Sequence, residues 1–424
     1  MISTRFLKKL SSPSSSAIRS FMISSPSKMS SRSPPAELLQ EMVVPPRQLF
    51  GPGPSNMADA IAETQSKNLL GHLHPEFVKI MSDTRLGIQY VFKTQNAYTF
   101  AVSGTGHAGM ECALVNLLER GDRFLSVEIG LWGARAADLA SRMGCEVRKV
   151  TAPHGKAVTV EELEKAITEF KPHVVFVCQG ESSTGVAQPL EKIGDICHQN
   201  GALFLVDTVA SLGGTPFDSD ALGVDCVYSA TQKVLNAPPG LAPISFSDRA
   251  IQKIRSRSQR VASFYFDALE LGNYWGCDQE LKRYHHTAPI STVYALRAAL
   301  QAIAKEGIDE TIERHHKNIQ YLYELLKNNN LEPFVEDEKL RLPCLTTIKV
   351  PEGVDWKDVA SDLMGQGVEI AGGLGATVGK IWRVGTFGIN SDRAKIEKVI
   401  GLLAAAVNKR RKKQVLFTRC AKIQ

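Results

Sequence analysis

Three short stretches of the sequence carry residues that could do chemistry, and each follows an apolar run. YSATQKVLNAPPG, residues 228–240, holds a single lysine, Lys233, among small and turn-forming residues. ALFLVD ends in the carboxylate of Asp207, and YTFAV leads into the glycine-rich turn SGTGH at residues 103–107. Taken alone, such turns are common, a strand-end aspartate often caps a helix, and a lysine is usually a solvated surface residue. A surface lysine fits poorly, however, beside the APPG turn that follows it.

Together the three stretches contain the parts of one cofactor site. Glycines let backbone N–H groups approach a ligand closely, and a following helix adds the positive end of its dipole, so the turn suits a phosphate. A lysine amine forms a Schiff base with an aldehyde, while a buried carboxylate pairs with a pyridinium nitrogen and keeps the ring an electron sink. The sequence therefore predicts a site for pyridoxal 5′-phosphate, with Lys233 as its covalent partner.

Short apolar runs that alternate with helical runs must position these residues. The alternation extends from Tyr98 to Asp207, and several of the short runs are apolar on both faces. This pattern favours a mainly parallel α/β sheet covered by helices, in which ligands collect outside the carboxyl ends of the strands. Past Pro289, long amphipathic helices and a few short strands predict a second, smaller α+β domain.

Composition disfavours several other classes of protein. The chain has 424 residues, of which 43% are hydrophobic and 22% charged, so it can form one large core and a smaller domain. No apolar run approaches the roughly 18 residues that a membrane-spanning helix needs. The formal charge of +6 comes largely from the two ends, which argues against a nucleic-acid patch. Eight cysteines stand singly, without Cys-x-x-Cys spacing, as expected of buried thiols in a reducing compartment.

The two ends of the chain bear on its location. The first 36 residues are basic and rich in serine, and no acidic residue precedes Glu37, which is typical of a mitochondrial transit peptide. A basic, disordered tail without an address is the alternative. The C-terminal FTRCAKIQ does not match the Ser-Lys-Leu peroxisomal signal. We expect a mitochondrial matrix protein, with a peroxisomal or cytosolic location as the weaker alternatives.

Seven longer motifs closely resemble one family. They are LFGPGPSN, SGTGHAGMECALVNLLERGD, GESSTGVAQPL, VDTVASLGGTPFD, SATQKVLNAPPG, NYWGCDQELKRYHHT and GGLGATVGKIWRVG. In type and order they are similar to motifs of the alanine-glyoxylate (serine-pyruvate) aminotransferases, members of the class V pyridoxal-phosphate aminotransferases. The resemblance extends from about Leu49 to the last helix. The insect 3-hydroxykynurenine transaminases share most of these motifs.

The resemblance implies a type I pyridoxal-phosphate fold. We expect a large domain with a mainly parallel seven-stranded sheet, a smaller α+β C-terminal domain, and a homodimer in which each active site is completed by the partner subunit. The expected divisions are a transit peptide at 1–36, an N-terminal arm and substrate-side loop at 37–60, a large cofactor-binding domain at 61–305, a small domain at 306–408 and a basic tail at 409–424.

The resemblance also assigns roles residue by residue. Lys233 is the Schiff-base lysine and general base, Asp207 pairs with the pyridinium nitrogen, and Arg383 clamps the substrate carboxylate through two parallel bonds. The residues expected to hold the cofactor are Thr105, Gly106, His107, Trp132, Ser182, Asp207, Gln232, Lys233, Tyr284 and Thr287. Those expected on the substrate side are Gly51, Gly53, Ser182 and Arg383.

Three of these positions have a more specific expected role. Trp132 stacks on the cofactor ring, where a large flat surface buries the ring and fixes its tilt. Tyr284 and Thr287, in RYHHT, reach the phosphate of the neighbouring subunit. We expect no metal site, because neither YHH nor His72-x-His74 has a third ligand placed nearby.

The implied activity is a ping-pong transfer of the amino group of L-alanine to glyoxylate, which gives pyruvate and glycine and removes glyoxylate; L-serine with pyruvate is a further pair. GHLHPEF, residues 71–77, is nearer to the insect transaminases, so the donor stays open among alanine, serine and kynurenine-type amino acids. A cysteine desulfurase is disfavoured because Gln232, not histidine, precedes the lysine. A catalytically silent protein is disfavoured because Lys233, Asp207 and Arg383 are all present.

Overall fold

The computed structural model describes residues 33–421, except for the side chains of residues 413–421. The expected transit peptide therefore lies almost wholly outside the described residues. Contacts divide the chain into residues 1–46 and 47–424, which are described separately. In the first unit the described residues are exposed and include one helical turn, η1 (Ala36–Leu39).

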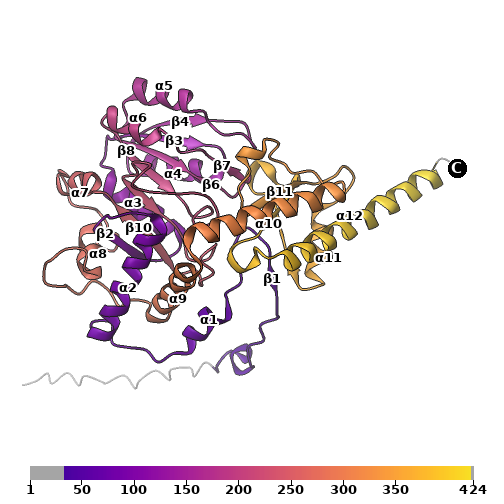
Figure 1. Cartoon of the computed structure of the whole chain (residues 1–424), viewed down its shortest axis with the longest axis horizontal. Coiled ribbons are helices and arrows are strands. Elements are labelled where there is room, and N and C mark those ends of the chain that lie inside the picture. Colours follow the sequence, from indigo (N-terminus) through magenta and orange to yellow (C-terminus); the bar gives the residue numbers. More distant parts are fainter. Residues whose placement is uncertain (1–32, 422–424) are drawn as a thin grey trace, which may run out of the picture. The chain divides into compact units, whose positions relative to one another are not determined.

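A seven-stranded sheet forms the centre of the second unit (Figure 1). Its strands, in spatial order, are β2 (Tyr98–Ser103), β10 (Leu241–Phe246), β9 (Cys226–Tyr228), β8 (Leu203–Asp207), β5 (Val174–Cys178), β3 (Arg123–Glu128) and β4 (Glu146–Thr151). The five strands from β9 to β4 are parallel, and β10 is antiparallel to both of its neighbours. The expected α/β class and mainly parallel seven-stranded sheet are confirmed.

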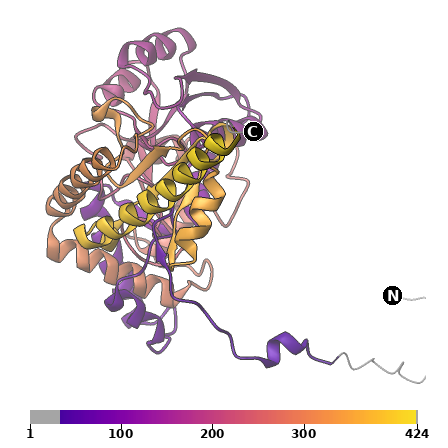
Figure 2. The same ribbon diagram turned by 90° about the vertical axis from the view of Figure 1, so that its right-hand side faces the viewer.

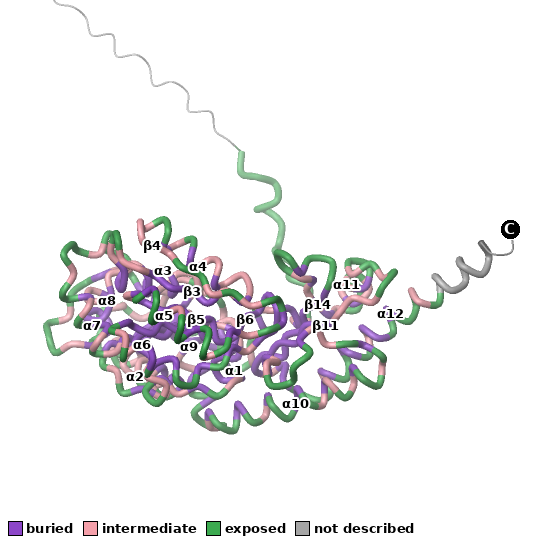
Figure 3. The backbone as a smooth tube through the Cα atoms, turned by 90° about the horizontal axis from the view of Figure 1, so that it is seen from above, coloured by how far each residue is buried: buried purple, intermediate pink, exposed green. Residues whose placement is uncertain are grey.

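Helices connect the strands and cover the sheet. They are α2 (Pro75–Phe92), α3 (Gly106–Leu117), α4 (Leu131–Arg142), α5 (Val160–Phe170), α6 (Ile193–Gln199), α7 (Asp248–Arg255), α8 (Ala268–Trp275) and α9 (Ile290–Glu306). Every residue of β5 and β8 is buried, as expected for continuous apolar strands packed on both faces. Buried backbone accordingly fills the middle of this unit, while the outer helices are exposed on their far sides (Figure 3).

A smaller core follows in the chain. β11 (Leu345–Lys349), β14 (Ile381–Gly385) and β13 (Ala371–Gly372) form a three-stranded antiparallel sheet, and β12 (Val368–Glu369) pairs in parallel with β1 (Gln48–Leu49). α11 (Trp356–Met364) and α12 (Arg393–Ala421) pack together beside them (Figure 2). The start of the second unit is thus tied to the last third of the chain.

The change of pattern at Pro289 does not mark the beginning of the second core. α9 packs against α2, and its residues Val293, Leu296 and Leu300 belong to the first core. α10 (Ile308–Asn328) joins the two cores, because Ile308 lies in the first and its later residues, including Leu322 and Leu326, lie in the second. One continuous helix therefore takes part in both cores.

Two further features concern the described residues alone. No described helix is long and apolar enough to cross a membrane. The seven cysteines whose side chains are described are free thiols, and all except Cys145 are buried. The expectation of buried single thiols holds for these six.

Candidate functional site

The carboxyl ends of neighbouring strands bring the predicted site residues to one edge of the large sheet. β8 ends at Asp207 and β9 at Tyr228, and the parallel register pairs these two residues. β2 ends at Ser103, where the glycine-rich turn begins. Lys233 follows β9 after a short turn. The turn, the carboxylate and the lysine thus leave the sheet on the same side.

Asp207 is a buried carboxylate held by two donors. Its Oδ2 accepts a hydrogen bond of 2.6 Å from the Tyr228 hydroxyl, and its Oδ1 accepts one of 2.7 Å from the Val209 N–H. Burial raises the pKa of Asp207 to about 6, although both bonds and the charge of Lys233 oppose the shift. Its position is fixed while its charge still calls for a cationic partner.

Lys233 is half-buried and lies beside the GPGP loop. Its Nζ donates a hydrogen bond to the Pro52 carbonyl and lies 5.3 Å from the centre of the Phe387 ring. Burial lowers the pKa of this lysine to about 8 from its ordinary value of 10.5. Gly53 has a φ of +106°, and a Cβ there would lie 2.7 Å from Lys233 Cδ, so this position requires glycine. The amine is both nucleophilic near neutral pH and closely enclosed.

The backbone of the lysine is tied to two other parts of the chain. The Ser55 hydroxyl donates to the Lys233 carbonyl at 2.8 Å, and Asn236 Nδ2 donates to Ser55 Oγ at 2.9 Å. Asn236 also donates to the Phe387 carbonyl and accepts a bond from the Ile389 N–H. Lysine, GPGP loop and second core therefore form one connected unit.

The glycine-rich turn has the features of an anion cradle. α3 begins at Gly106, and its N-cap residue Thr105 makes no side-chain cap bond, so the first N–H groups of the helix are available. A Cβ on Gly106 would lie 3.1 Å from Val209 Cγ2, so the turn has little room for a side chain there. The buried amide oxygen of Gln232 has no hydrogen-bond partner among the described residues. An amide oxygen can only accept, so this atom calls for a donor, whereas the N–H groups of the turn and of the helix start fit a phosphate.

The expected ring-stacking tryptophan stands at the start of α4. Its indole N–H donates to Ser182 Oγ at 2.9 Å. The His107 ring lies edge-on to Trp132, with ring centres 5.4 Å apart. Arg135 Nη1 lies 3.1 Å from His107 Nε2, and since arginine can only donate, His107 carries its proton on Nδ1. Burial and the Arg135 charge lower the pKa of His107, which keeps the ring neutral.

Arg383 lies in β14 and is buried, with 8% of its surface exposed. Its Nε donates to the Gly372 carbonyl at 2.7 Å and its Nη1 to the Ser182 carbonyl at 3.4 Å. Burial lowers the pKa of Arg383 from its usual range, and the charge of Glu181 opposes this shift. Two bonds leave further guanidinium N–H groups for a carboxylate.

The loop with Gly51 and Gly53 lies between the lysine and the strand of the buried arginine. The Phe50 carbonyl accepts a bond of 2.8 Å from the N–H of Gly385, the last residue of β14. Gly53 faces Lys233 at the other end of the loop. Both glycines of the expected substrate side therefore border the same space.

Tyr284 and Thr287 are exposed, and neither makes a hydrogen bond within the described part of the chain. The Tyr284 ring lies 5.5 Å from the ring of His72. His286, between them, has its Nε2 2.7 Å from Ser103 Oγ, so this segment does lie against the start of the glycine-rich turn. The two side chains themselves are not brought into the cradle of their own chain.

The paired histidines of YHH are bonded in a fixed order. His285 Nε2 lies 3.0 Å from the Phe264 carbonyl, which can only accept, so this nitrogen carries the proton of a neutral ring. His285 Nδ1 then accepts from His286 Nδ1, at 2.8 Å. His286 Nε2 accepts from the Ser103 hydroxyl. The pair is thus a hydrogen-bonded link to the turn.

Sequence reasoning missed four residues of the site. Tyr228 and Ser55 bond the key groups, Asn236 joins three segments, and Glu181 is wholly buried beside Trp132. A signal existed only for Asn236, which has a φ of +53° in a turn, a conformation that asparagine tolerates. The other three act through contacts with distant segments.

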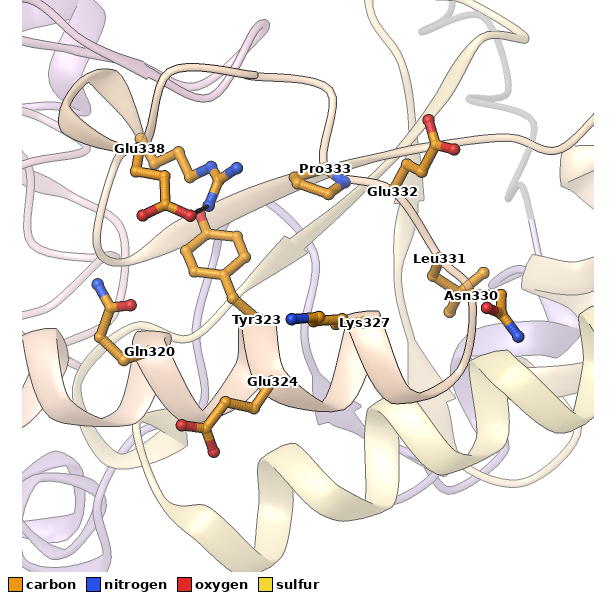
Figure 4. A pocket seen from close by; sticks show the side chains of 10 residues that line it. Gln320, Tyr323, Glu324, Lys327, Asn330, Leu331, Glu332, Pro333 and Glu338 are labelled. Carbon is orange, nitrogen blue, oxygen red and sulfur yellow. Dashed lines mark hydrogen bonds and ion pairs between the residues drawn. The ribbon is translucent and has the colours of Figure 1, made fainter.

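A separate cavity of about 540 Å³ opens on the second core (Figure 4). It is lined along α10 by Tyr323 and Lys327, among others. Arg341 also lines it, but this side chain bonds Glu338 at 3.1 Å and stacks 4.5 Å from the Tyr323 ring centre. None of the predicted site residues lines this cavity. The sheet edge, with buried groups of shifted pKa, is the candidate site.

The chain matches the family described as "Aminotransferase class-V" over residues 58–399. It is 45% identical over 377 residues to an alanine–glyoxylate aminotransferase of Felis catus, covering 89% of this chain and 91% of that one. It is 44% identical over 376 residues to the protein of the same name from Drosophila melanogaster, covering 88% and 95%. A solved structure of an alanine–glyoxylate aminotransferase from Nostoc sp. is similar to it with a TM-score of 0.85 at 43% identity, covering 88% of this chain and 98% of that chain.

Proposed function

This chain belongs to the class-V aminotransferase family, and from that premise we propose that it transfers the amino group of L-alanine to glyoxylate, giving pyruvate and glycine. One observation carries the proposal. A half-buried lysine with a lowered pKa, a buried carboxylate and an uncapped helix N-terminus share one sheet edge, and a buried arginine lies across the GPGP loop from the lysine. The relatives with this printed name support the substrate pair.

The residues present fit pyridoxal 5′-phosphate. The first N–H groups of α3 and the amide NH2 of Gln232 would donate to the phosphate, while Asp207 would pair with the ring nitrogen. When bound, the cofactor supplies a ring that stabilises negative charge at the substrate α-carbon. Burial raises the pKa of Asp207 although the charge of Lys233 opposes the shift, and a protonated ring nitrogen would give this carboxylate a directly bonded cationic partner.

Lys233 serves as the covalent anchor of the cofactor and as the base. With a pKa of about 8, roughly a tenth of its amine is unprotonated at pH 7, far more than for an exposed lysine. With its amine free, Lys233 Nζ would take the proton from the α-carbon of the amino donor, and in the second half of the reaction it would give a proton to the α-carbon of the oxo acid. Its enclosure by Gly53 and Pro52 keeps the amine beside the substrate.

Arg383 binds the substrate carboxylate, and the surrounding loop limits substrate size. The planar guanidinium can form two parallel bonds to a carboxylate. Gly51 and Gly53 contribute no side chains to the space between Arg383 and the lysine. Substrates as small as alanine and glyoxylate suit such a site.

We infer that the chain acts as a homodimer with shared sites. Large apolar side chains are exposed near the RYHHT segment, namely Phe264 at 61%, Tyr265 at 42%, Leu281 at 90% and Tyr284 at 59%. Clustered exposed aromatic residues favour an interface with a second protein surface. A second copy covering them would also give Tyr284 and Thr287 a binding site to complete. Sedimentation analysis tests the dimer, and a monomer at micromolar concentration would overturn it.

We also propose that the protein is imported into mitochondria and cleaved near residue 36. The serine-rich, basic composition of the first 36 residues supports this location. Sequencing the amino terminus of the protein isolated from its own cells tests it. A mature protein that begins at Met1 would contradict cleavage.

The absorption spectrum of the cofactor-loaded protein tests the activity. We expect the visible band of the bound cofactor to disappear on addition of L-alanine and to return on addition of glyoxylate. A band that ignores alanine but responds to 3-hydroxykynurenine would replace the donor. Absence of a band after loading would overturn the proposed cofactor site.

A further inference from the structure

Glu181 is a buried carboxylate to which the proposed reaction gives no part. None of its surface is exposed, and it is the last residue of β6 (Gly180–Glu181), where the GESSTG segment turns toward β7 (Val186–Ala187). Its Oε1 accepts a bond of 2.9 Å from the Ser183 N–H, and its Oε2 accepts one of 3.0 Å from the Trp132 N–H. A buried carboxylate is costly, and both oxygens of this one accept hydrogen bonds from backbone N–H groups.

The turn caps α4 from a distant part of the chain. α4 begins at Leu131 after Gly130, which has no side chain to serve as an N-cap. The Leu131 N–H donates to Ser183 Oγ at 3.0 Å, and the next N–H, that of Trp132, donates to Glu181. A Cβ on Gly130 would lie 2.5 Å from Ser183 Oγ, so the absence of a local cap is what admits this turn.

The same turn contacts the groups on both sides of the site. Between the two capping residues, Ser182 accepts the indole N–H of Trp132 on its hydroxyl and Arg383 Nη1 on its carbonyl. The turn is fixed in turn by the second core, because Thr347 Oγ1 donates to the Thr184 carbonyl at 2.9 Å. A shift of Glu181 would therefore move Trp132, and it would also displace Ser182, whose carbonyl accepts the bond from Arg383.

We propose that Glu181 is a positioning residue that sets the tilt of Trp132 against the cofactor ring by capping α4 from the GESSTG turn, and that it thereby keeps Ser182 in place for Arg383. This inference rests on the proposed function. Glu181 is assigned no contact with substrate or cofactor; it acts through these neighbours and through its charge, which favours the charged form of Arg383 and so opposes the lowering of that residue's pKa by burial.

Four variants in the full-length dimer test the proposal. Glu181→Ala removes both bonds and Glu181→Gln keeps one acceptor. Ser183→Ala removes the hydroxyl that accepts the Leu131 N–H but keeps the Glu181 carboxylate. Glu164→Gln, on the exposed face of α5, is the control. The first readout is the visible circular dichroism of bound pyridoxal phosphate, which reports the environment and tilt of the ring. The second is the dissociation constant of the cofactor.

We expect a graded series. Glu181→Ala should weaken cofactor binding roughly tenfold and at least halve the dichroic band. Glu181→Gln should have a smaller effect on both quantities, and Ser183→Ala the smallest. The control should change neither quantity. The kcat should fall more than KM rises, since the arginine itself remains. Folded Glu181→Ala with the dichroic band and cofactor affinity of the original protein would overturn the proposal. If that variant does not fold, Glu181→Gln and Ser183→Ala decide by the same comparison.

A cofactor-free readout separates this inference from the proposed function. Amide hydrogen exchange at the start of α4 should be faster in Glu181→Ala and Ser183→Ala than in the control, whatever the protein binds. If exchange is faster in these two variants but the original protein shows no cofactor band, the role of Glu181 and Ser183 as caps is supported and the proposed function is contradicted. Unchanged exchange in both variants would overturn the cap itself.

Discussion

Two helices, α3 and α4, begin near the same site without a local side-chain cap, but among the described residues side chains bond the first N–H groups of α4 and not those of α3. At α3 the side chain of the N-cap residue Thr105 bonds none of the first N–H groups. At α4 the first two N–H groups are bonded by Ser183 and Glu181. An open helix N-terminus can receive an anion from solution, whereas a closed one can only hold its own helix in place. In the proposed function the first would receive the cofactor phosphate, and the second would hold the side chains of the site in place.

Removal of Lys233 separates binding at the open helix from chemistry. In Lys233→Ala the phosphate cradle remains but the nucleophile and base are lost, so transamination should fall at least about a thousandfold while cofactor still binds without a covalent bond. Steady-state assays and equilibrium dialysis measure the two effects. Lys165→Ala, on the exposed face of α5, is the control. Measurable turnover near that of the control would contradict the role of the lysine.

Replacement of Arg383 tests whether substrate binding, near α4, is separate from cofactor binding at the start of α3. Arg383→Lys keeps the charge but cannot form two parallel bonds, so the KM for alanine and glyoxylate should rise on the order of a hundredfold. Cofactor affinity should stay within about twofold, because the arginine does not contact the cradle at α3. Arg120→Lys, an exposed change, is matched to it. Equal losses of cofactor and substrate affinity would argue against separate roles for the two helices.

A pair of alanine substitutions compares the two helix starts directly. Gly106→Ala adds a Cβ 3.1 Å from Val209, and should weaken cofactor binding about tenfold with little change in the stability of the cofactor-free protein. Gly130→Ala places a Cβ against Ser183 and Glu181, and should lower the free energy of unfolding by about 1–3 kcal/mol even without cofactor. Urea titration and cofactor titration separate the two. A loss of stability in Gly106→Ala together with a loss of cofactor affinity alone in Gly130→Ala would contradict these roles of the two helix starts.

The effect of pH is the mildest test. Because burial lowers the pKa of Lys233 to about 8, covalent capture of added cofactor should speed up about tenfold between pH 7 and pH 9 and then level off. The unfolded state binds more protons than the folded one between pH 8 and 10.5, so the cofactor-free protein should also gain stability over that interval. Stopped-flow absorbance follows the capture. A rate that keeps rising to pH 10.5 would indicate an exposed lysine.

The sheet edge was predictable because parallel strands end on one side. Asp207 and the glycine-rich turn each follow a continuous apolar run, and Lys233 comes shortly after another. β10 was harder to predict, since Pro243 lies inside LAPISF and proline argues against an interior strand. Its register shows how the proline is accommodated, because the Pro243 carbonyl still accepts a bond from the Ser229 N–H.

The cap on α4 could not be predicted from local sequence. Glu181 and Ser183 lie about fifty residues from the helix they cap, and a local pattern would place such residues just before the helix. The role of α10 was equally hidden, because its apolar face is continuous and gives no sign that Ile308 and Leu326 join different cores. Tertiary contacts alone determine these features.

The bond between Asn390 Nδ2 and the Leu49 carbonyl joins residues 341 positions apart and, with β1 and β12, anchors the loop that borders the lysine. During synthesis the segment that carries this loop leaves the ribosome early, yet its partners are among the last to emerge. A growing chain can therefore assemble most of its large sheet while the catalytic pocket stays unfinished. The enzyme would acquire activity only on release of nearly the whole polypeptide, which delays reactive chemistry until folding is almost complete.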